Sequence, residues 1–252
     1  MKPDALAALA RRKNSLLCVA LDPSEEAFGK GLTVDQAEGL LLRIIEKTAP
    51  YAVAYKLNTA FYERWGEKGW ALMRRIRAAL PTDSLSIADA KRGDIAHTNR
   101  YYAKALYEDL GFDAVTAHPY LGWEALTPFL EYAGKWVFVL LRTTEAPPWQ
   151  ASVWRSIVET APLETPAKIG WVWGAHHTAT LSEFRAKRPN DWLLMPGLGA
   201  QGAHIESGLP IYPALLVVGR ALLQAPESAA NWSAQTAHLL PISEATGRFE
   251  LP

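Results

Sequence analysis

The stretch Leu85-Ser-Ile-Ala-Asp-Ala-Lys-Arg-Gly-Asp-Ile95 joins an apolar run to a cluster of charges. Its first part, Leu85 to Ala90, has the length and the apolar, partly β-branched composition of a buried β-strand. Charged residues stand at the end of that strand and just beyond it. Because residues two apart on a strand share a face, we expect Asp89 and Lys91 to point the same way, with Asp94 on the following loop.

The same kind of apolar run recurs along the chain, and helix-length segments separate most neighbouring runs. The other predicted strands are Leu16 to Leu21, Tyr51 to Leu57, Ala114 to Ala117, Trp136 to Leu141, Gly170 to Gly174, Trp192 to Met195 and Leu215 to Val218. One intervening helix is expected to begin at a capping box, Thr33-Val-Asp-Gln36. About eight β/α units favour one (β/α)8 barrel domain over residues 1–252, with an open doubly wound sheet as the competing arrangement.

The segment from Arg142 to Lys168 is expected to interrupt this regular pattern. It contains prolines at positions 147, 148, 162 and 166, and proline breaks helices. We therefore predict an elaborated loop around one short helix near Ser152 to Thr160.

Composition and charge argue against several kinds of partner. The 26 basic and 26 acidic side chains cancel, so no overall field attracts DNA or RNA, and we expect no nucleic-acid partner. No apolar run approaches the roughly 18 residues of a membrane span, and positive charges at 11 to 13 cut short the N-terminal apolar stretch. The single cysteine, Cys18, cannot form an intramolecular disulfide. We therefore expect a cytoplasmic protein without a membrane partner.

Charged residues also end the two strands that precede Asp89 in the sequence. Lys56 lies near the end of Ala52-Val-Ala-Tyr-Lys-Leu-Asn58, and Asp22 ends Val19-Ala-Leu-Asp-Pro23. Strands adjacent in sequence are usually neighbours in a barrel, so we expect Lys56 to face Asp89. Barrel enzymes keep their sites at the C-terminal ends of the strands, which predicts an active site here. The alternative is that these charged residues form ordinary salt bridges at the strand ends, without a catalytic role.

A second pattern, near the C-terminus, is typical of a phosphate site. Pro196-Gly-Leu-Gly-Ala-Gln-Gly202 follows the seventh predicted strand, and Val217-Val-Gly-Arg-Ala221 ends the eighth. Backbone N–H groups exposed by glycines can bind phosphate oxygens, and the guanidinium of Arg220 can bind two of them. The glycines also fit the dinucleotide fingerprint G-x-G-x-x-G, but no acidic residue ends the next strand, which disfavours an NAD site.

The histidines give no comparable signal. His176 and His177 are neighbours in sequence that would face opposite ways on a strand, so we expect a structural or surface role rather than a shared metal ion. His97 and His118 lie near the predicted rim of the barrel, but nothing specific in the sequence indicates that they act in acid–base catalysis.

Four segments resemble orotidine 5′-phosphate decarboxylase, particularly the bacterial type 2 branch of that family. They are Asp89-Ala-Lys-Arg-Gly-Asp-Ile95, Asp113-Ala-Val-Thr116, Pro119-Tyr-Leu-Gly122 and Pro196-Gly-Leu-Gly-Ala-Gln-Gly202. The Asp-x-Lys-x-x-Asp signature belongs to a wider superfamily, whereas its Ala-Lys-Arg-Gly-Asp-Ile context is more specific. The resemblance implies a barrel homodimer that converts orotidine 5′-phosphate to uridine 5′-phosphate and carbon dioxide, the last step of de novo UMP synthesis. It also implies that no metal and no organic cofactor takes part.

The resemblance assigns catalytic roles to the charged cluster. Loss of carbon dioxide leaves electron density at ring carbon six, where a fixed ammonium can stabilise the carbanion and then protonate it. Lys91 matches the family's proton donor, Asp89 would lie near the departing carboxylate, and Lys56 would link the carboxylates to the ribose. The residues expected to enter the partner subunit's site are Asp94, Ile95 and Thr98. A complete site would then need the dimer.

The remaining assignments concern binding of the nucleotide substrate. By the family pattern Asp22 binds a ribose hydroxyl, and Thr144 stands where a serine commonly touches the base. The expected phosphate-binding positions and the start of their loop are Pro196, Gln201, Gly219 and Arg220. The chain departs from the family at Thr143-Thr-Glu-Ala-Pro147, where Thr-Ser-Asn-Pro-Gly is usual, and at His118, which replaces a more usual asparagine.

Two other functions fit parts of the pattern. A magnesium-dependent sugar-phosphate lyase or decarboxylase of the same superfamily shares the signature of the third strand but needs an acidic metal ligand on the second. That strand ends Tyr55-Lys-Leu-Asn58, and an ammonium there disfavours a divalent cation. A catalytically silent nucleotide-binding barrel would have no need to retain every charge, and catalytic turnover would distinguish it.

Overall fold

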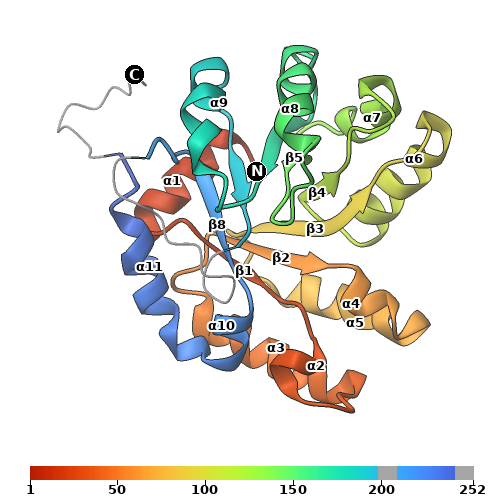
Figure 1. Cartoon of the computed structure of the whole chain (residues 1–252). Helices are drawn as coiled ribbons and strands as arrows, with labels where there is room; N and C mark the ends of the chain where they lie inside the picture. The colour runs from red at the N-terminus through yellow and green to blue at the C-terminus, as the bar shows by residue number, and fades with distance from the viewer. Residues whose placement is uncertain (198–208, 242–252) are drawn as a thin grey trace.

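Eight parallel strands close into a barrel in sequence order in the computed structural model, which describes residues 1–197 and 209–241 (Figure 1). The strands are β1 (Leu17–Ala20), β2 (Ala54–Asn58), β3 (Leu85–Arg92), β4 (Ala114–Ala117), β5 (Trp136–Arg142), β6 (Lys168–Trp173), β7 (Leu193–Met195) and β8 (Ala214–Val218). β8 pairs with β1, so the sheet is closed. The (β/α)8 barrel is therefore confirmed, and the open doubly wound sheet is excluded.

Helices surround the barrel (Figure 1). They are α1 (Pro3–Lys13), α2 (Glu25–Phe28), α3 (Val34–Thr48), α4 (Ala60–Glu63), α5 (Gly66–Ala79), α6 (Ala96–Ala103), α7 (Trp123–Leu130), α8 (Gln150–Glu159), α9 (Leu181–Lys187), α10 (Arg220–Gln224) and α11 (Ala229–Ala237). A π-helical turn, Lys104–Asp109, continues α6, and two 3-10 turns lie at Thr178–Thr180 and Pro226–Ser228. The predicted capping box begins α3: the Gln36 N–H donates to Thr33 Oγ1 over 3.3 Å, and the Thr33 N–H donates to Gln36 Oε1 over 3.0 Å.

Aromatic side chains fix the helices that follow β5 and β6. The Trp154 ring of α8 packs edge-on against Trp173 of β6, with ring centroids 5.3 Å apart, and Phe184 of α9 lies 5.2 Å from the same ring. Trp154 and Phe184 are fully buried, so this contact removes large apolar surfaces from water. The helix predicted near Ser152 to Thr160 is thus present as α8, which begins two residues earlier.

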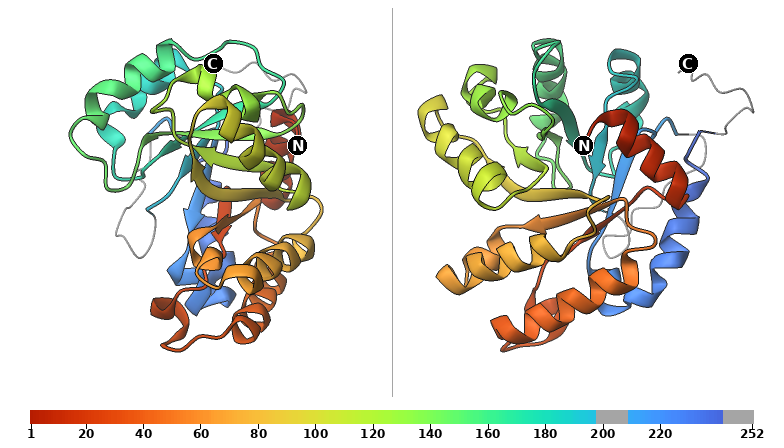
Figure 2. Two further views of the ribbon diagram at one scale, coloured as in Figure 1. Left: turned by 90° about the vertical axis from the view of Figure 1, so that its right-hand side faces the viewer. Right: turned by 180° about the vertical axis from the view of Figure 1, so that it is seen from behind.

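The N-terminal helix lies across the end of the barrel where the strands begin. The Trp136 Nε1–H, at the start of β5, donates to the carbonyl of Met1 over 2.6 Å. At the other end of α1, the Ser233 hydroxyl of α11 donates to the carbonyl of Asn14 over 3.2 Å. Figure 2 shows α1 and α11 side by side. The opposite end of the barrel, where the strands finish, is left to form a site.

No helix within residues 1–197 and 209–241 combines the length and apolar character needed to cross a bilayer.

Candidate active site

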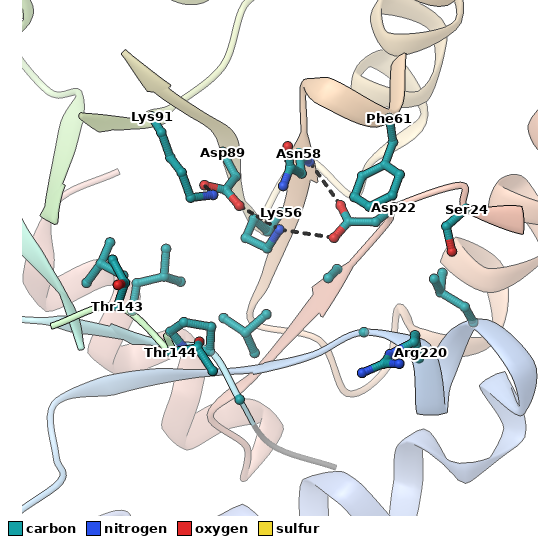
Figure 3. Close-up of a pocket in the computed structure, with 18 of the residues that line it drawn as sticks. Asp22, Ser24, Lys56, Asn58, Phe61, Asp89, Lys91, Thr143, Thr144 and Arg220 are labelled. Atoms are coloured by element: carbon teal, nitrogen blue, oxygen red, sulfur yellow. Dashed lines mark hydrogen bonds and ion pairs between the residues drawn. The ribbon is translucent and has the colours of Figure 1, made fainter. Parts of the chain in front are cut away.

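A cavity of about 570 Å³ opens at the C-terminal ends of the strands (Figure 3). Its lining includes these residues that the sequence predicted for the site: Asp22, Lys56, Asp89, Lys91, Thr144, Pro196, Gly219 and Arg220. They follow or end β1, β2, β3, β5, β7 and β8, so the closed barrel brings together positions far apart in the sequence. This is the end of the barrel at which such folds place catalytic residues.

Four of these side chains form a row of alternating charge along β1, β2 and β3. Lys91 Nζ lies 2.6 Å from Asp89 Oδ1, and Lys56 Nζ lies 2.9 Å from Asp89 Oδ2. Lys56 Nζ also lies 3.3 Å from Asp22 Oδ2. Each carboxylate therefore contacts at least one ammonium, and Figure 3 shows the row along one wall of the cavity.

Burial and charge act in opposite directions on this row. Asp89 is 7% exposed, and burial alone would raise its pKa, but the charges and hydrogen bonds of Lys56 and Lys91 outweigh burial and hold the pKa well below its usual range. Burial alone would lower the pKa of Lys56, but Asp22 and Asp89 outweigh it and raise that pKa. Both groups therefore stay charged at neutral pH. The Lys91 side chain is 47% exposed and presents its ammonium to the cavity.

A bulge in β3 lies at Asp89 and Lys91, which both line the cavity. Lys91 has φ of 46°, in the left-handed region that side chains other than glycine rarely adopt. Three residues of β3, Asp89 to Lys91, lie opposite the single residue Thr116 of β4. The flanking pairs are Ala88 with Val115 and Arg92 with Ala117. The expected pairing of Asp89 with Lys91 is present, and nothing in the sequence marked the bulge beside it.

The side of the cavity where the sequence predicts phosphate binding lies across from the charged row (Figure 3). Arg220 begins α10, directly after β8, and its guanidinium points into the cavity. Gly219 lines the cavity beside it, and an added Cβ there would lie 3.5 Å from the Ala20 side chain. Gln201 lies outside the described residues.

The loop after β5 is held against the end of β6. His177 Nε2 lies 2.9 Å from the Thr143 carbonyl, and the Arg142 guanidinium donates to His177 Nδ1 over 3.1 Å. Because Nδ1 accepts, Nε2 carries the proton. Burial, together with the charge of Arg142, lowers the pKa of His177 despite the bond to Thr143, which favours this neutral form. The expected structural role of His177 is therefore observed, although the residue follows β6 rather than lying on a strand.

Further residues line the cavity that the sequence reasoning did not select. They are Ser24, Glu26, Asn58, Phe61 and Thr143 among the polar and aromatic ones. Asn58 was detectable, because it stands two positions after Lys56 on the same strand and so shares its face. Ser24 and Phe61 lie beyond the strand ends, where no periodic pattern marks the direction of a side chain.

Asp94, Ile95 and Thr98 are absent from the described lining of this cavity. Ile95 caps the start of α6 and is 60% exposed. Asn99 fixes the backbone of Asp94, since its Oδ1 accepts from the Asp94 N–H over 3.1 Å and its Nδ2 donates to the Asp94 carbonyl over 2.8 Å. None of the three therefore belongs to the described lining of the cavity in its own chain.

Comparison with known proteins identifies similar sequences and structures. The profile of the orotidine 5′-phosphate decarboxylase / HUMPS family matches residues 15–235. The orotidine 5′-phosphate decarboxylase of Thermomicrobium roseum is 40% identical over 239 residues, which cover 86% of this chain and 85% of that protein. The enzyme of the same name from Dehalococcoides mccartyi (strain 195) is 39% identical over 211 residues, covering 77% and 76%.

Solved structures agree with the sequence comparison. The OMP decarboxylase of Leishmania donovani superposes with a TM-score of 0.79 at 34% identity, covering 94% of this chain and 98% of that chain. The UMP synthase of the same organism gives a TM-score of 0.81 at 34% identity, covering 94% of this chain and 56% of that longer chain.

Proposed function

The chain belongs to the orotidine 5′-phosphate decarboxylase / HUMPS family, and from that membership we propose that it converts orotidine 5′-phosphate to uridine 5′-phosphate and carbon dioxide. This is the last step of de novo UMP synthesis. The observation that carries the proposal is the row Lys91, Asp89, Lys56 and Asp22 at the cavity wall, with contacts of 2.6 to 3.3 Å. The specific context of the β3 signature favours the bacterial type 2 branch.

The proposed chemical step uses the ammonium of Lys91. The bond between ring carbon six and the carboxylate breaks, its electron pair stays on carbon six, and carbon dioxide leaves. A positive charge fixed beside that carbon stabilises the developing carbanion, and a proton from Nζ then bonds to it. Lys91 becomes a neutral amine and regains a proton from solvent. These residues supply the charge stabilisation and the proton, so we propose that no metal or organic cofactor is needed.

Asp89 has two parts in this proposal. It holds Lys91 Nζ at 2.6 Å, which fixes the direction of the ammonium. Its carboxylate would also lie near that of the substrate, and the repulsion between them is relieved as carbon dioxide departs. Lys56, which contacts both Asp89 and Asp22, reduces the repulsion between the two carboxylates. In this proposal it also contacts the ribose.

The rest of the cavity suits a nucleotide. In this proposal Asp22, beside Lys56, binds a ribose hydroxyl, and Thr144, from the loop after β5, touches the base; both line the cavity. In this proposal Arg220 and the backbone N–H of Gly219 bind the phosphate, and Pro196 begins the loop after β7; all three line the cavity. Binding of the phosphate far from the reacting carbon supplies energy that can hold the substrate for the chemical step.

The magnesium-dependent sugar-phosphate alternative conflicts with the position of Lys56. Its ammonium lies between the carboxylates of Asp22 and Asp89, at 3.3 and 2.9 Å, and so occupies the space between the two oxygen donors. A divalent cation there would have to displace a buried ammonium and would repel it.

We expect the purified, EDTA-treated protein to turn over orotidine 5′-phosphate without added metal. The measurement is the loss of the substrate's ultraviolet absorbance, with uridine 5′-phosphate identified by chromatography. No turnover by folded, dimeric protein would refute the proposed function. Activity on a sugar phosphate that appeared only with added magnesium would move the assignment to the neighbouring activity.

We expect Arg220→Ala to raise KM by roughly 10- to 100-fold, because hydrogen bonds to a charged group contribute about 1.5–3 kcal/mol each. The control is Arg43→Ala, which removes an exposed arginine from α3. Initial rates over a range of substrate concentrations separate KM from kcat. A KM within about twofold of wild type in Arg220→Ala would contradict phosphate binding by this residue.

We also propose a homodimer in which Asp94, Ile95 and Thr98 enter the partner subunit's site. Large apolar side chains are exposed near these residues, on α6 and the loop after β4. They are Ile95, Tyr101, Tyr120 and Leu121, which are 60%, 67%, 84% and 48% exposed. Such a group of exposed apolar side chains is typical of an association surface. A cytoplasmic location belongs to the same proposal and is consistent with the single, buried free thiol of Cys18.

A further inference from the structure

Thr116 of β4 is in direct contact with both members of the Asp89–Lys91 pair. Its Oγ1 lies 2.9 Å from Asp89 Oδ1 and 2.9 Å from the backbone nitrogen of Lys91. Thr116 is 1% exposed. Asp89 Oδ1 is also the oxygen that accepts from Lys91 Nζ, so one carboxylate oxygen joins the threonine hydroxyl to the ammonium.

The bulge in β3 explains why a hydroxyl is needed at this place. Thr116 is the one residue of β4 between the paired Val115 and Ala117, and it faces the three bulged residues of β3. A bulge interrupts the regular ladder of backbone hydrogen bonds. The Thr116 hydroxyl replaces one of these hydrogen bonds. Its oxygen accepts the hydrogen bond that the Lys91 N–H would otherwise donate to a neighbouring strand.

The direction of the two hydrogen bonds is fixed by chemistry. A backbone N–H can only donate, so Thr116 Oγ1 must accept from Lys91. The hydroxyl proton is then directed to the Asp89 carboxylate, which can only accept while it is ionised. One side chain thus holds the strained backbone of Lys91 and the carboxylate that orients its ammonium.

Other groups hold two carbonyls of the bulge. The Arg92 guanidinium donates to the carbonyl of Ala90 over 2.9 Å, and the Thr59 N–H donates to the carbonyl of Asp89 over 3.4 Å. Arg92 is itself paired with Glu63 of α4. These contacts fix the backbone, whereas the Thr116 hydroxyl touches both the backbone and the Asp89 side chain.

We propose that Thr116 is a positioning residue for decarboxylation, which keeps Asp89 and Lys91 in the geometry of the chemical step. This inference rests on the proposed function. When Lys91 gives its proton to carbon six it loses its charge, and its hold on Asp89 Oδ1 weakens. The Thr116 hydroxyl keeps its hydrogen bond to that oxygen, so Asp89 stays in place until Lys91 is protonated again.

The test compares Thr116→Val, which removes the hydroxyl at constant shape, with Thr116→Ser, which retains it. Because small misplacements of reacting groups cost about 100-fold in rate, we expect Thr116→Val to lower kcat by roughly 10- to 100-fold. KM and the Kd of uridine 5′-phosphate should stay within about threefold, since ribose and phosphate binding uses other residues. Thr116→Ser should return kcat to within about fivefold of wild type, the difference reflecting its looser side-chain rotamer.

Thr236→Val is a matched control for the loss of a buried hydroxyl. Thr236 Oγ1 accepts from the Leu16 N–H over 3.1 Å and donates to the Ser233 carbonyl over 2.9 Å, outside the described lining of the cavity. Both valine variants should lower Tm, but only Thr116→Val should lower kcat. If Thr116→Val does not fold, Thr116→Ala removes the same hydroxyl together with the methyl group.

Two outcomes would overturn the inference. A kcat of Thr116→Val within about twofold of wild type would show that the hydroxyl is not needed. A kcat of Thr116→Ser as low as that of Thr116→Val would show that restoring the hydroxyl does not restore turnover, so its two hydrogen bonds would not be what positions Asp89 and Lys91. An inactive wild-type protein would instead refute the proposed function, and the role of Thr116 with it.

Discussion

Lys91→Ala is expected to lower kcat by roughly 10⁴-fold or more. General acid catalysis contributes about 10²–10⁴-fold, and a fixed group that stabilises developing charge adds about 10²–10³-fold. In the proposed mechanism Lys91 supplies both, because its ammonium stands at the reacting carbon and carries the proton that replaces carbon dioxide. Alanine can do neither.

The fold should survive this substitution. The Lys91 side chain is 47% exposed, and Asp89 would keep its contacts with Lys56 and Thr116, at 2.9 Å each. Tm and the circular dichroism spectrum should therefore stay near those of wild type, and uridine 5′-phosphate should still bind. Lys68→Ala, which removes an exposed lysine from α5, is the control. Turnover by Lys91→Ala close to that of wild type would rule out the proton-donor role.

The sequence predicted the strands because burial on both faces leaves a continuous apolar run. The predicted ends of the strands differ from the observed ones where burial changes. β2 begins at Ala54 rather than Tyr51, which lies in the preceding turn and is only partly buried. β6 begins at Lys168, where an exposed lysine gives no sign of a strand.

The charged row was predictable because Asp22, Lys56 and Asp89 end consecutive strands, and barrel closure places such ends side by side. The bulge was not predictable. Lysine in the left-handed region carries no sequence marker of the kind that glycine provides. Thr116 lies in a segment with family resemblance, but its contact with Asp89 follows from the bulge and so could be found only in the structure.

The second large effect concerns Asp94 and requires two chains. We expect Asp94→Ala, like Lys91→Ala, to be nearly inactive as a homodimer. A heterodimer of the two variants, co-expressed with different affinity tags and purified on both, should regain about half of the wild-type activity per dimer if each Asp94 serves its partner's site. The site on the Asp94→Ala chain then has its own Lys91 and receives Asp94 from the other chain.

The geometry favours this arrangement over action of Asp94 within its own chain. Asn99 holds the Asp94 backbone at the start of α6, and the Asp94 carboxylate accepts from the Ile95 N–H over 2.7 Å. The described lining of the cavity does not include Asp94. The exposed Ile95 beside it would contact the second chain in the proposed dimer. A carboxylate from the partner chain on the exposed side of Lys91 would add one more negative group to the row of alternating charges.

The control heterodimer pairs Lys91→Ala with a chain that carries both substitutions, so that neither site is complete. It should show no recovery. If Asp94 acted within its own chain, both sites of the test heterodimer would carry one defect, and its activity would stay as low as that of the control. Half-recovery in the test heterodimer alone therefore requires that Lys91 of one chain and Asp94 of the other act in the same site.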